Sequence, residues 1–598
     1  MTEILPTVLA RRAAHHPDRI AIRHKDLGRW KEYTWADYSD HVTRAGLAFM
    51  ALGVTSGDRI AVIGENRPEW LFADLGGQAI GAVIVGVYTT CPAAEVQYLL
   101  EHSGSVVVVV EDEEQLDKVL LVRHRLPALR HIVVIEPRGA GHHLHDPMTQ
   151  TWDQCMALAE GRDPGVFAAA RDTVAPDAAA ILVYTSGTTG PPKGAILTHR
   201  NLAVTGKVWG GVFDTRPEDE VLSYLPLCHI LERGLSTVVA VSVGYAVNFG
   251  GGGESLISDL REVQPTFFVG VPRVWEKMLA SIEVRMADAS WLKRKVYATW
   301  LPVGRRLARK KLEPHGRWTM VDNVLQAVGW LVLFRPLRER LGLARIRQAG
   351  SGAAPIAPQV LEFFWAIGVP IYEGYGQTEG TGLATFNPPG AARIGTVGLP
   401  LPGVEVRIAD DGEILVRSEG VFAGYYRNEE ATRETVDADG WLHSGDVGEF
   451  DAEGYLRITD RKKDIIITAG GKNLSPSWIE NKLKVSPWVR EAIVIGDRRK
   501  YVTALIGIEL DTVRDWATRQ QIAFTTYRDL TEKSEVRRLI QDWVDEVNAE
   551  LAQVEQVKQF AFLPKELDHE EGELTATQKV KRKAITTMFA DLVEGMYR

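Results

Sequence analysis

Residues Tyr184 to Gly194, with the sequence YTSGTTGPPKG, form the segment of this chain best suited to bind phosphate. The segment holds four Ser/Thr hydroxyls, three glycines and one lysine, and it follows the apolar run from Ala178 to Val183. Hydroxyls and backbone N–H groups bind phosphate oxygens, glycine lets the backbone approach closely, and Lys193 adds a positive point charge. It is not a Walker A loop, because Gly194 follows the lysine where that motif needs Ser or Thr. A polar linker is the alternative, but the segment better predicts a nucleotide site.

A second glycine-rich segment, IYEGYGQTEG at residues 371–380, places a carboxylate beside the predicted phosphates. A carboxylate next to polyphosphate is repelled unless a divalent cation lies between them, and Mg²⁺ accepts carboxylate and phosphate oxygens together. We therefore predict Glu379 and the hydroxyl of Thr185 as ligands of Mg²⁺. The alternative is a surface turn with a solvated Glu379.

Two other segments have the residue types to hold a nucleoside. AGSGAAP, residues 349–355, is small enough for an adenine ring to lie on its backbone, with Tyr375 as a stacking partner. Close helix–strand packing is the alternative for that segment. In WLHSGDVG, residues 441–448, we expect Asp446 in a tight turn, where its carboxylate could accept both vicinal ribose hydroxyls. Bonds to local backbone are the alternative for a turn Asp.

In their order and spacing, these motifs resemble those of the adenylate-forming enzymes, which include acyl-CoA synthetases, adenylation domains and luciferases. The resemblance extends over residues from about 10 to 590 of the 598-residue chain. It implies that ATP and a carboxylic acid form acyl-AMP with Mg²⁺ as cofactor, and that a small C-terminal domain then reorients. Asp446 and Arg461 would hold the ribose, and Asp460 would be the hinge.

The resemblance also implies a set of nucleotide contacts. The ATP- or AMP-binding residues would be Thr185, Ser186, Gly187, Thr188, Thr189, Gly190, Lys193, Gly352, Ala353, Ala354, Glu373, Gly374, Tyr375, Gly376, Thr378, Asp446 and Arg461.

The segment LTATQKVKRKA near the C-terminus matches the family's adenylation lysine at Lys579. In the family this lysine bridges the carboxylate oxygen and the α-phosphate, so Lys579, Lys193, Thr185 and Glu379 would form the catalytic set. The family often has Gly before the lysine, whereas this chain has Gln578, so Lys581 and Lys583 stay as alternatives. From composition alone, a solvated basic tail is the default interpretation.

The segment TAGGKN at residues 468–473 resembles the loop that lines the pantetheine tunnel for CoA. Its Gly470, Gly471 and Lys472 would lie along the thin arm of CoA. An ordinary glycine turn is the alternative.

Within the family, VPRVWEK at residues 271–277, the YLPLCH segment and the insert after Arg285 resemble long-chain fatty acid–CoA ligases. His229 of YLPLCH matches a histidine near the acyl pocket, with a buried core histidine as the alternative. The implied partners are ATP, a long-chain fatty acid and CoA. Other functions to weigh are a fatty acyl-AMP ligase that loads a carrier protein, an inactive membrane-associated fatty acid uptake or binding protein, and a luciferase-like oxygenase.

The insert between Arg285 and Arg347 has fifteen Lys/Arg residues against four Asp/Glu, interleaved with tryptophans. Basic, Trp-rich helical sequence suits contact with anionic lipid headgroups. A solvated, partly packed insert is the alternative.

The overall composition indicates a soluble globular enzyme, with a net charge of −9 that excludes a nucleic-acid-binding surface over the whole molecule. Three widely spaced cysteines suggest neither a zinc site nor a disulfide framework, which favours a reducing cytoplasm. No signal peptide or stretch of about 18 apolar residues is present, so the expected location is cytoplasmic, with peripheral contact at the inner face of the membrane. A dimer is compatible with the sequence, which does not define the oligomeric state.

These motifs need a scaffold of alternating strands and helices, which the sequence also predicts. Short apolar runs, such as residues 59–63 and 105–110, alternate with amphipathic helical segments, as in doubly wound, mostly parallel α/β sheets. After about residue 395, alternating residues around Asp-Asp-Gly predict a β-meander or barrel. We expect a large N-terminal domain over residues 1–459 and a small, mobile α+β domain over residues 460–598.

Overall fold

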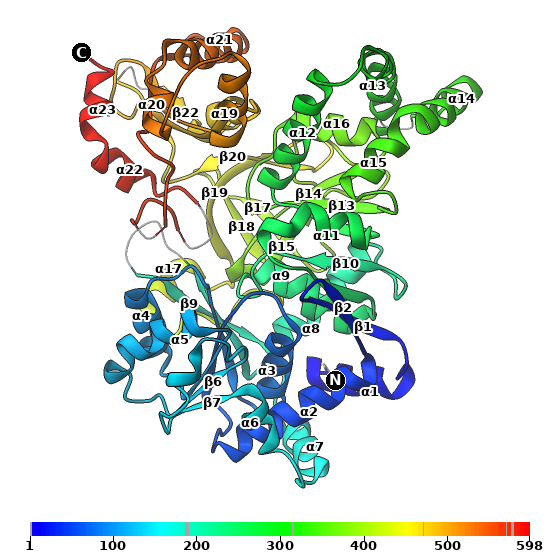
Figure 1. Ribbon diagram of the computed structural model, residues 1–598, viewed down its shortest axis with the longest axis vertical. Helices are drawn as coiled ribbons and strands as arrows, with labels where there is room; N and C mark the ends of the chain where they lie inside the picture. Colours follow the sequence, from blue (N-terminus) through cyan, green and yellow to red (C-terminus); the bar gives the residue numbers. More distant parts are fainter. Residues whose placement is uncertain (1–2, 186–190, 314–315, 470–471, 570, 576–578) are drawn as a thin grey trace.

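The computed structural model describes residues 3–185, 191–313, 316–469, 472–569, 571–575 and 579–598 (Figure 1). A large lobe at the bottom and right of Figure 1 carries the N-terminus, and a small lobe at the upper left carries the C-terminus. The predicted site residues come from both lobes.

A seven-stranded sheet forms the first part of the large lobe, in the order β7-β6-β5-β3-β4-β8-β9. All neighbouring strands are parallel except β8 and β9, which form an antiparallel hairpin. Ile60 and Val62 of β3 enter one buried cluster, whereas Ala61 and Ile63 enter another. Apolar cores therefore cover both faces, which confirms the predicted doubly wound sheet.

The strands of this sheet are β3 (Arg59–Ile63), β4 (Val83–Val87), β5 (Val107–Val110), β6 (His131–Val134), β7 (Thr149–Thr151), β8 (Ala179–Thr185) and β9 (Lys193–Thr198). One face is packed by α3 (Pro68–Ala79), α6 (Trp152–Ala157) and α7 (Pro164–Thr173). The other face is packed by α4 (Ala93–Ser103) and α5 (Glu113–Val122).

Two further sheets complete the α/β part of the large lobe, in the orders β10-β11-β1-β2 and β12-β13-β14-β15-β16. In each of these orders the first three strands are parallel to one another, and the remaining strands pair in an antiparallel way. Their strands are β1 (Ile20–Asp26), β2 (Arg29–Thr34), β10 (Glu220–Ser223), β11 (Ala246–Phe249), β12 (Phe267–Val269), β13 (Gln348–Ser351), β14 (Ile371–Gln377), β15 (Gly382–Phe386) and β16 (Leu399–Pro400). The associated helices are α1 (Leu5–His15), α2 (Trp35–Ala51), α8 (His199–Val212), α11 (Leu256–Val263) and α16 (Pro358–Ala366).

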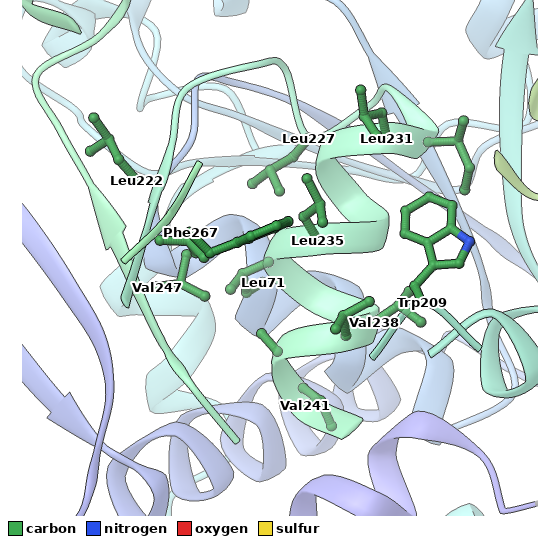
Figure 2. Close-up of a cluster of buried hydrophobic side chains, with 14 of the residues drawn as sticks. Leu71, Trp209, Leu222, Leu227, Leu231, Leu235, Val238, Val241, Val247 and Phe267 are labelled. Atoms are coloured by element: carbon green, nitrogen blue, oxygen red, sulfur yellow. The ribbon is translucent and has the colours of Figure 1, made fainter. Parts of the chain in front are cut away.

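A buried helix after His229 runs through α9 (Ile230–Arg233), the π turn η3 (Gly234–Val239) and α10 (Ala240–Val243). Figure 2 shows Leu231, Leu235 and Val238 along it, with Trp209 and Phe267 of other elements nearby. Because His229 caps the start of this helix, the buried cluster fixes the position of the histidine.

The predicted meander is an antiparallel sheet of β17 (Glu405–Ile408), β18 (Glu413–Arg417), β19 (Leu442–Phe450) and β20 (Leu456–Arg461). The helix α17 (Glu429–Thr435) lies between β18 and β19. Just before α17, residues 423–426 run beside β9 through backbone hydrogen bonds of 2.8 to 3.0 Å to Gly194 and Ile196. The meander segment is thereby tied to the strand that begins with Lys193.

The small lobe has its own apolar clusters, separate from those of the large lobe. Its strands are β21 (Ile466–Ile467), β22 (Asn473–Leu474), β23 (Val489–Ile495), β24 (Val502–Ile508) and β25 (Val557–Phe562). Its helices are α18 (Pro476–Lys484), α19 (Leu510–Arg519), α20 (Tyr527–Thr531), α21 (Ser534–Glu550), α22 (Arg582–Met588) and α23 (Ala590–Gly595).

The basic insert, residues 285–347, lies mostly in helices that stand out from the large lobe at the upper right of Figure 1. It starts at the end of α12 (Pro272–Ala287) and continues through α13 (Trp291–Leu312), α14 (Met320–Gly329), the π turn η5 (Trp330–Phe334) and α15 (Arg335–Leu341). Within the described part of the chain, no helix combines the length and the apolar character needed to cross a bilayer.

Candidate functional site

The segment predicted to bind phosphate begins and ends in the β8–β9 hairpin. Thr185 is the last residue of β8 and pairs with Lys193, the first residue of β9. The hairpin thus holds the predicted ligand hydroxyl and the predicted phosphate-binding ammonium at the same end of the sheet. The rest of the predicted phosphate contacts lie outside the described residues, namely Ser186, Gly187, Thr188, Thr189 and Gly190.

The two predicted Mg²⁺ ligands lie next to each other. Glu379 belongs to a single 3₁₀ turn after β14, and its Oε1 is 3.5 Å from the Oγ1 of Thr185, 194 residues earlier in the chain. The Tyr425 hydroxyl donates to the same Oε1 at 2.7 Å, and the Lys193 Nζ lies 5.1 Å from the centre of the Tyr425 ring. Two oxygen donors beside a lysine match the chemistry of a magnesium–phosphate site.

Sequence analysis missed Tyr425. It belongs to the segment that runs beside β9, so only the folded chain brings its hydroxyl to Glu379. Its GYY sequence was included in the predicted meander, and the aromatic pair was the only local signal.

Asp446 lies inside a strand, so the prediction of a tight turn was wrong. It is part of β19 and pairs directly with Arg461 of β20, because antiparallel pairing of the two strands reaches as far as Asp446. Its Oδ1 lies 3.1 Å from the Arg461 Nε, and the Tyr375 hydroxyl donates to its Oδ2 at 2.8 Å. Burial raises the pKa of Asp446, while Arg461 and the Tyr375 hydroxyl act in the opposite direction.

Tyr375 is almost fully buried, in the middle of β14. The same strand carries Glu373, Gly374 and Gly376, and Thr378 begins the turn that holds Glu379. The predicted nucleotide contacts of residues 373–379 therefore lie along one strand and its end.

The small residues predicted to face adenine follow β13, the neighbour of β14. A Cβ on Gly352 would lie 3.0 Å from the Gly374 carbonyl oxygen, and Ala353 has a left-handed φ of +68°. Close packing of the two strands is therefore one reason why position 352 needs a glycine. Ala354 follows on the exposed surface beyond the strand. Burial raises the pKa of Glu373 to about 8, so its carboxyl group favours the neutral form near pH 7.

Lys579 brings the small lobe to this site. Desolvation, and then the positive charge of Arg461, lower the pKa of the Lys579 ammonium. The side chain nevertheless keeps accessible surface. Asp446 and Glu379 act on this pKa in the opposite direction, as expected for nearby carboxylates. Lys579 is thus close enough to both carboxylates for their charges to act on its ammonium, whereas Lys581 and Lys583 lie at the start of α22.

His229 lies on the same side of the site as Lys579. Its Nδ1 accepts a hydrogen bond of 3.2 Å from the Leu231 N–H at the start of α9. Desolvation, and then the charge of Lys579, lower the pKa of His229 to about 4. The imidazole is consequently neutral at pH 7, as both a core histidine and a pocket-lining histidine would be.

The predicted hinge residue, Asp460, is buried at the end of β20. Its carboxylate accepts hydrogen bonds from the hydroxyls of Ser475 (2.6 Å) and Ser477 (2.9 Å), at the start of α18 in the small lobe. Lys472 is exposed in a turn closed onto Thr468, and among the described residues no hydrogen bond or ion pair joins it to the carboxylates above. Gly470 and Gly471 lie outside the described residues.

Comparisons with known proteins identify the family of this chain. The family model for AMP-binding enzymes matches residues 9–426, and the model for their C-terminal domain matches residues 463–598. The long-chain-fatty-acid–CoA ligase FadD15 of Mycobacterium tuberculosis is 35% identical over 97% of this chain and 95% of its own. The long-chain-fatty-acid–CoA ligase ACSBG1 of Homo sapiens is 31% identical over 97% of this chain and 83% of its own.

Solved structures share the fold at lower identity. The anthranilate CoA ligase AuaEII in complex with anthranoyl-AMP is 22% identical, with a TM-score of 0.71 over 98% of this chain and 97% of its own. The A domain of a carboxylic acid reductase from Segniliparus rugosus, with AMP and a co-purified carboxylic acid, is 20% identical, with a TM-score of 0.75 over 100% and 94%. The resemblance found in the sequence is confirmed, and the chain belongs to the family of AMP-binding enzymes.

Proposed function

We propose that this protein is a long-chain fatty acid–CoA ligase that works through an acyl-adenylate. The observation that carries the proposal is that Lys579 of the small lobe lies close enough to Glu379 and Asp446 of the large lobe for their charges to act on its ammonium. The similarity to long-chain-fatty-acid–CoA ligases over nearly the whole chain supports the choice of substrate class.

In the first half-reaction, a fatty carboxylate oxygen attacks the α-phosphorus of ATP, and the bond from that phosphorus to the bridging oxygen of pyrophosphate breaks. Lys579 holds the attacking carboxylate against the α-phosphate, and Lys193 binds the outer phosphates. Asp446, oriented by Tyr375 and Arg461, accepts the ribose hydroxyls. Catalysis is positioning and charge stabilisation, and no covalent enzyme intermediate is needed.

Mg²⁺ suits the donor set beside the phosphate segment. Thr185 Oγ1 and Glu379 Oε1 are both hard oxygen donors, 3.5 Å apart, on the side of the hairpin that carries Lys193. When bound there, Mg²⁺ would neutralise charge on the phosphates. The Tyr425 hydroxyl orients the carboxylate for this purpose.

In the second half-reaction, the CoA sulfur attacks the acyl carbon, AMP leaves and the thiol proton passes to solvent. For this step we propose that residues 460–598 rotate as a domain about Asp460 relative to residues 1–459. The rotation would take Lys579 away and bring Gly470, Gly471 and Lys472 to the pantetheine arm. Separate apolar clusters in the two lobes support such a movement.

The basic insert suits peripheral contact with an anionic bilayer at the inner face of the membrane. An apolar stripe along α14 and η5 faces solvent, with Val321 at 65%, Val324 at 61% and Leu331 at 70% exposure. The adjoining helix α13 exposes the basic side chains Arg305, Arg306, Arg309 and Lys311. Apolar side chains beside cations are the composition that binds an anionic lipid surface.

The function is tested with fatty acids from C6 to C24, scored separately for pyrophosphate release and for acyl-CoA formation. We expect both products, with the highest kcat/KM for long chains and acyl-CoA formation dependent on CoA. Pyrophosphate release without acyl-CoA would instead indicate a ligase that loads a carrier protein. Absence of both products with every acid would contradict the proposal.

A further inference from the structure

Cys91, Glu95 and His569 meet at the contact between the two lobes. Cys91 precedes α4, Glu95 is in the first turn of α4, and His569 lies in the segment between β25 and Lys579. One ligand-type atom from each residue lies within 4.8 Å of the other two. In Figure 1 the red segment next to α22 descends toward α17 and α4.

The Nε2 atom of the His569 imidazole is directed at Glu95 of this group. Its Nδ1 donates to the Leu574 carbonyl at 2.9 Å, which leaves a lone pair on Nε2 in the neutral ring. The side chain is only 6% exposed, and Nε2 makes no hydrogen bond with any described residue. Nε2 lies 3.3 Å from the Glu95 Oε2. A histidine held by a backbone carbonyl, with its second nitrogen free, has the arrangement of a metal ligand.

The other two residues complete a set of soft and hard donors. Cys91 is fully buried, so its sulfur is shielded from solvent. Glu95 is 23% exposed, which leaves a path for an ion from solvent. Among the residues that the structure describes, no other three Cys, His, Asp or Glu side chains gather this closely.

We propose that Cys91, Glu95 and His569 form an interlobe binding site for a zinc-class divalent cation. Sulfur, imidazole nitrogen and carboxylate oxygen are the ligands of Zn²⁺, and three protein ligands plus one water complete a tetrahedral site. On binding, the Cys91 S–H bond breaks, its proton passes to solvent and the thiolate coordinates the metal. Mg²⁺ prefers oxygen ligands and is excluded by this donor set.

A metal bound at this site would act on the segment that carries Lys579, an effect that rests on the proposed function. His569 comes from the small lobe and the other two ligands come from the large lobe, so the site exists only while Lys579 faces Glu379. A ligand at about 100 times its Kd favours the state that binds it by about 100-fold. Bound metal therefore holds the enzyme in its adenylating arrangement, and acyl-AMP accumulates while thioester formation slows.

Binding is tested with Co²⁺ and then Zn²⁺ on the full chain, without nucleotide. We expect one Co²⁺ per chain with a thiolate-to-cobalt charge-transfer band, which Zn²⁺ removes by displacement. Cys91→Ala should abolish the band, whereas Cys155→Ala, the loss of another buried free cysteine, should leave it unchanged. Loss of an outer-shell partner costs about 10- to 100-fold in affinity, so Glu95→Gln and His569→Ala should weaken binding by at least about 100-fold.

The effect on the reaction is tested with excess Mg·ATP. Saturating Zn²⁺ should slow acyl-CoA formation at least about 10-fold in the wild type while acyl-AMP still forms, and Glu95→Gln should be insensitive. No charge-transfer band in the wild type, or a band that persists in Cys91→Ala, would overturn the site. Zn²⁺ bound at this site with unchanged acyl-CoA formation would contradict the inference that bound metal holds the enzyme in its adenylating arrangement. Absence of acyl-AMP in metal-free wild type would contradict the proposed function alone, because the Co²⁺ titration does not depend on it.

Discussion

Replacing Lys579 with methionine should separate the two half-reactions. The substitution keeps an unbranched side chain and removes only the ammonium that faces Glu379 and Asp446. The local backbone should persist, because the bonds that close this turn involve the Lys579 main chain: its N–H donates to the Thr575 hydroxyl at 3.0 Å, and its carbonyl accepts from the Thr575 N–H at 2.8 Å.

The size of the loss follows from the surroundings of the ammonium. Lys579 is partly desolvated but keeps accessible surface, so an effective dielectric near about 20 applies rather than that of dry protein or water. A unit charge about 4 Å from charge that develops on the phosphate then contributes about 4 kcal/mol. This corresponds to about 10³-fold in the rate of adenylation, within the range for removal of one electrostatic contact.

The assay measures pyrophosphate release from ATP and a long-chain acid, and, separately, acyl-CoA formation from synthetic acyl-AMP. Lys579→Met should lose about three orders of magnitude in the first reaction and stay near the wild-type rate in the second. Lys581→Met and Lys583→Met are the matched controls and should retain both activities. Equal loss in both half-reactions would refute the idea that Lys579 acts only in adenylation. Full adenylation activity in Lys579→Met would instead assign the catalytic role to Lys581 or Lys583.

Three further outcomes are expected. Glu379→Gln should lower adenylation by about 10²-fold at limiting Mg²⁺, with partial recovery at high Mg²⁺; wild-type rates at limiting metal would remove Glu379 from the metal site. Burial lowers the pKa of His199 to about 4, and neither ring nitrogen has a hydrogen-bond partner among the described residues. Below a pH of about 6.5, His199 takes up a proton in the unfolded chain while it stays neutral in the folded protein. The wild type should therefore lose about 2 kcal/mol of unfolding free energy through His199 between pH 7 and pH 5. Denaturant titrations should show His199→Met losing less stability over that interval, and equal losses would contradict burial of a neutral ring. Val324→Glu with Leu331→Glu should lower sedimentation with anionic vesicles at low salt at least about 10-fold and leave neutral-vesicle binding unchanged; undiminished sedimentation would show that the stripe does not contact lipid.

The sequence predicted those features that depend on local pattern. The run RIAVI became β3 at residues 59–63 because consecutive apolar residues satisfy two cores at once. The segment predicted to bind phosphate does follow a buried strand, β8, as the apolar run before it indicates.

Features that depend on contacts between distant segments could not be predicted in the same way. Asp446 follows a Ser-Gly pair typical of a turn, but pairing with β20 keeps it in a strand. Tyr425 approaches Glu379 because residues 423–426 are bound to β9, and no local pattern encodes that contact. The placement of Lys579 and His569 depends on how two separately packed lobes meet.

The segment that runs beside β9 also protects the largest sheet of the protein. β9 is an outermost strand, and an unpaired outer strand offers its backbone to other chains and promotes aggregation. Here Gly194 and Ile196 make backbone hydrogen bonds to residues 423–426, and the same segment carries Tyr425, whose hydroxyl donates to Glu379. Changes that loosen this segment should therefore lower solubility as well as magnesium affinity, because one segment both covers the sheet edge and holds the tyrosine that orients the Glu379 carboxylate.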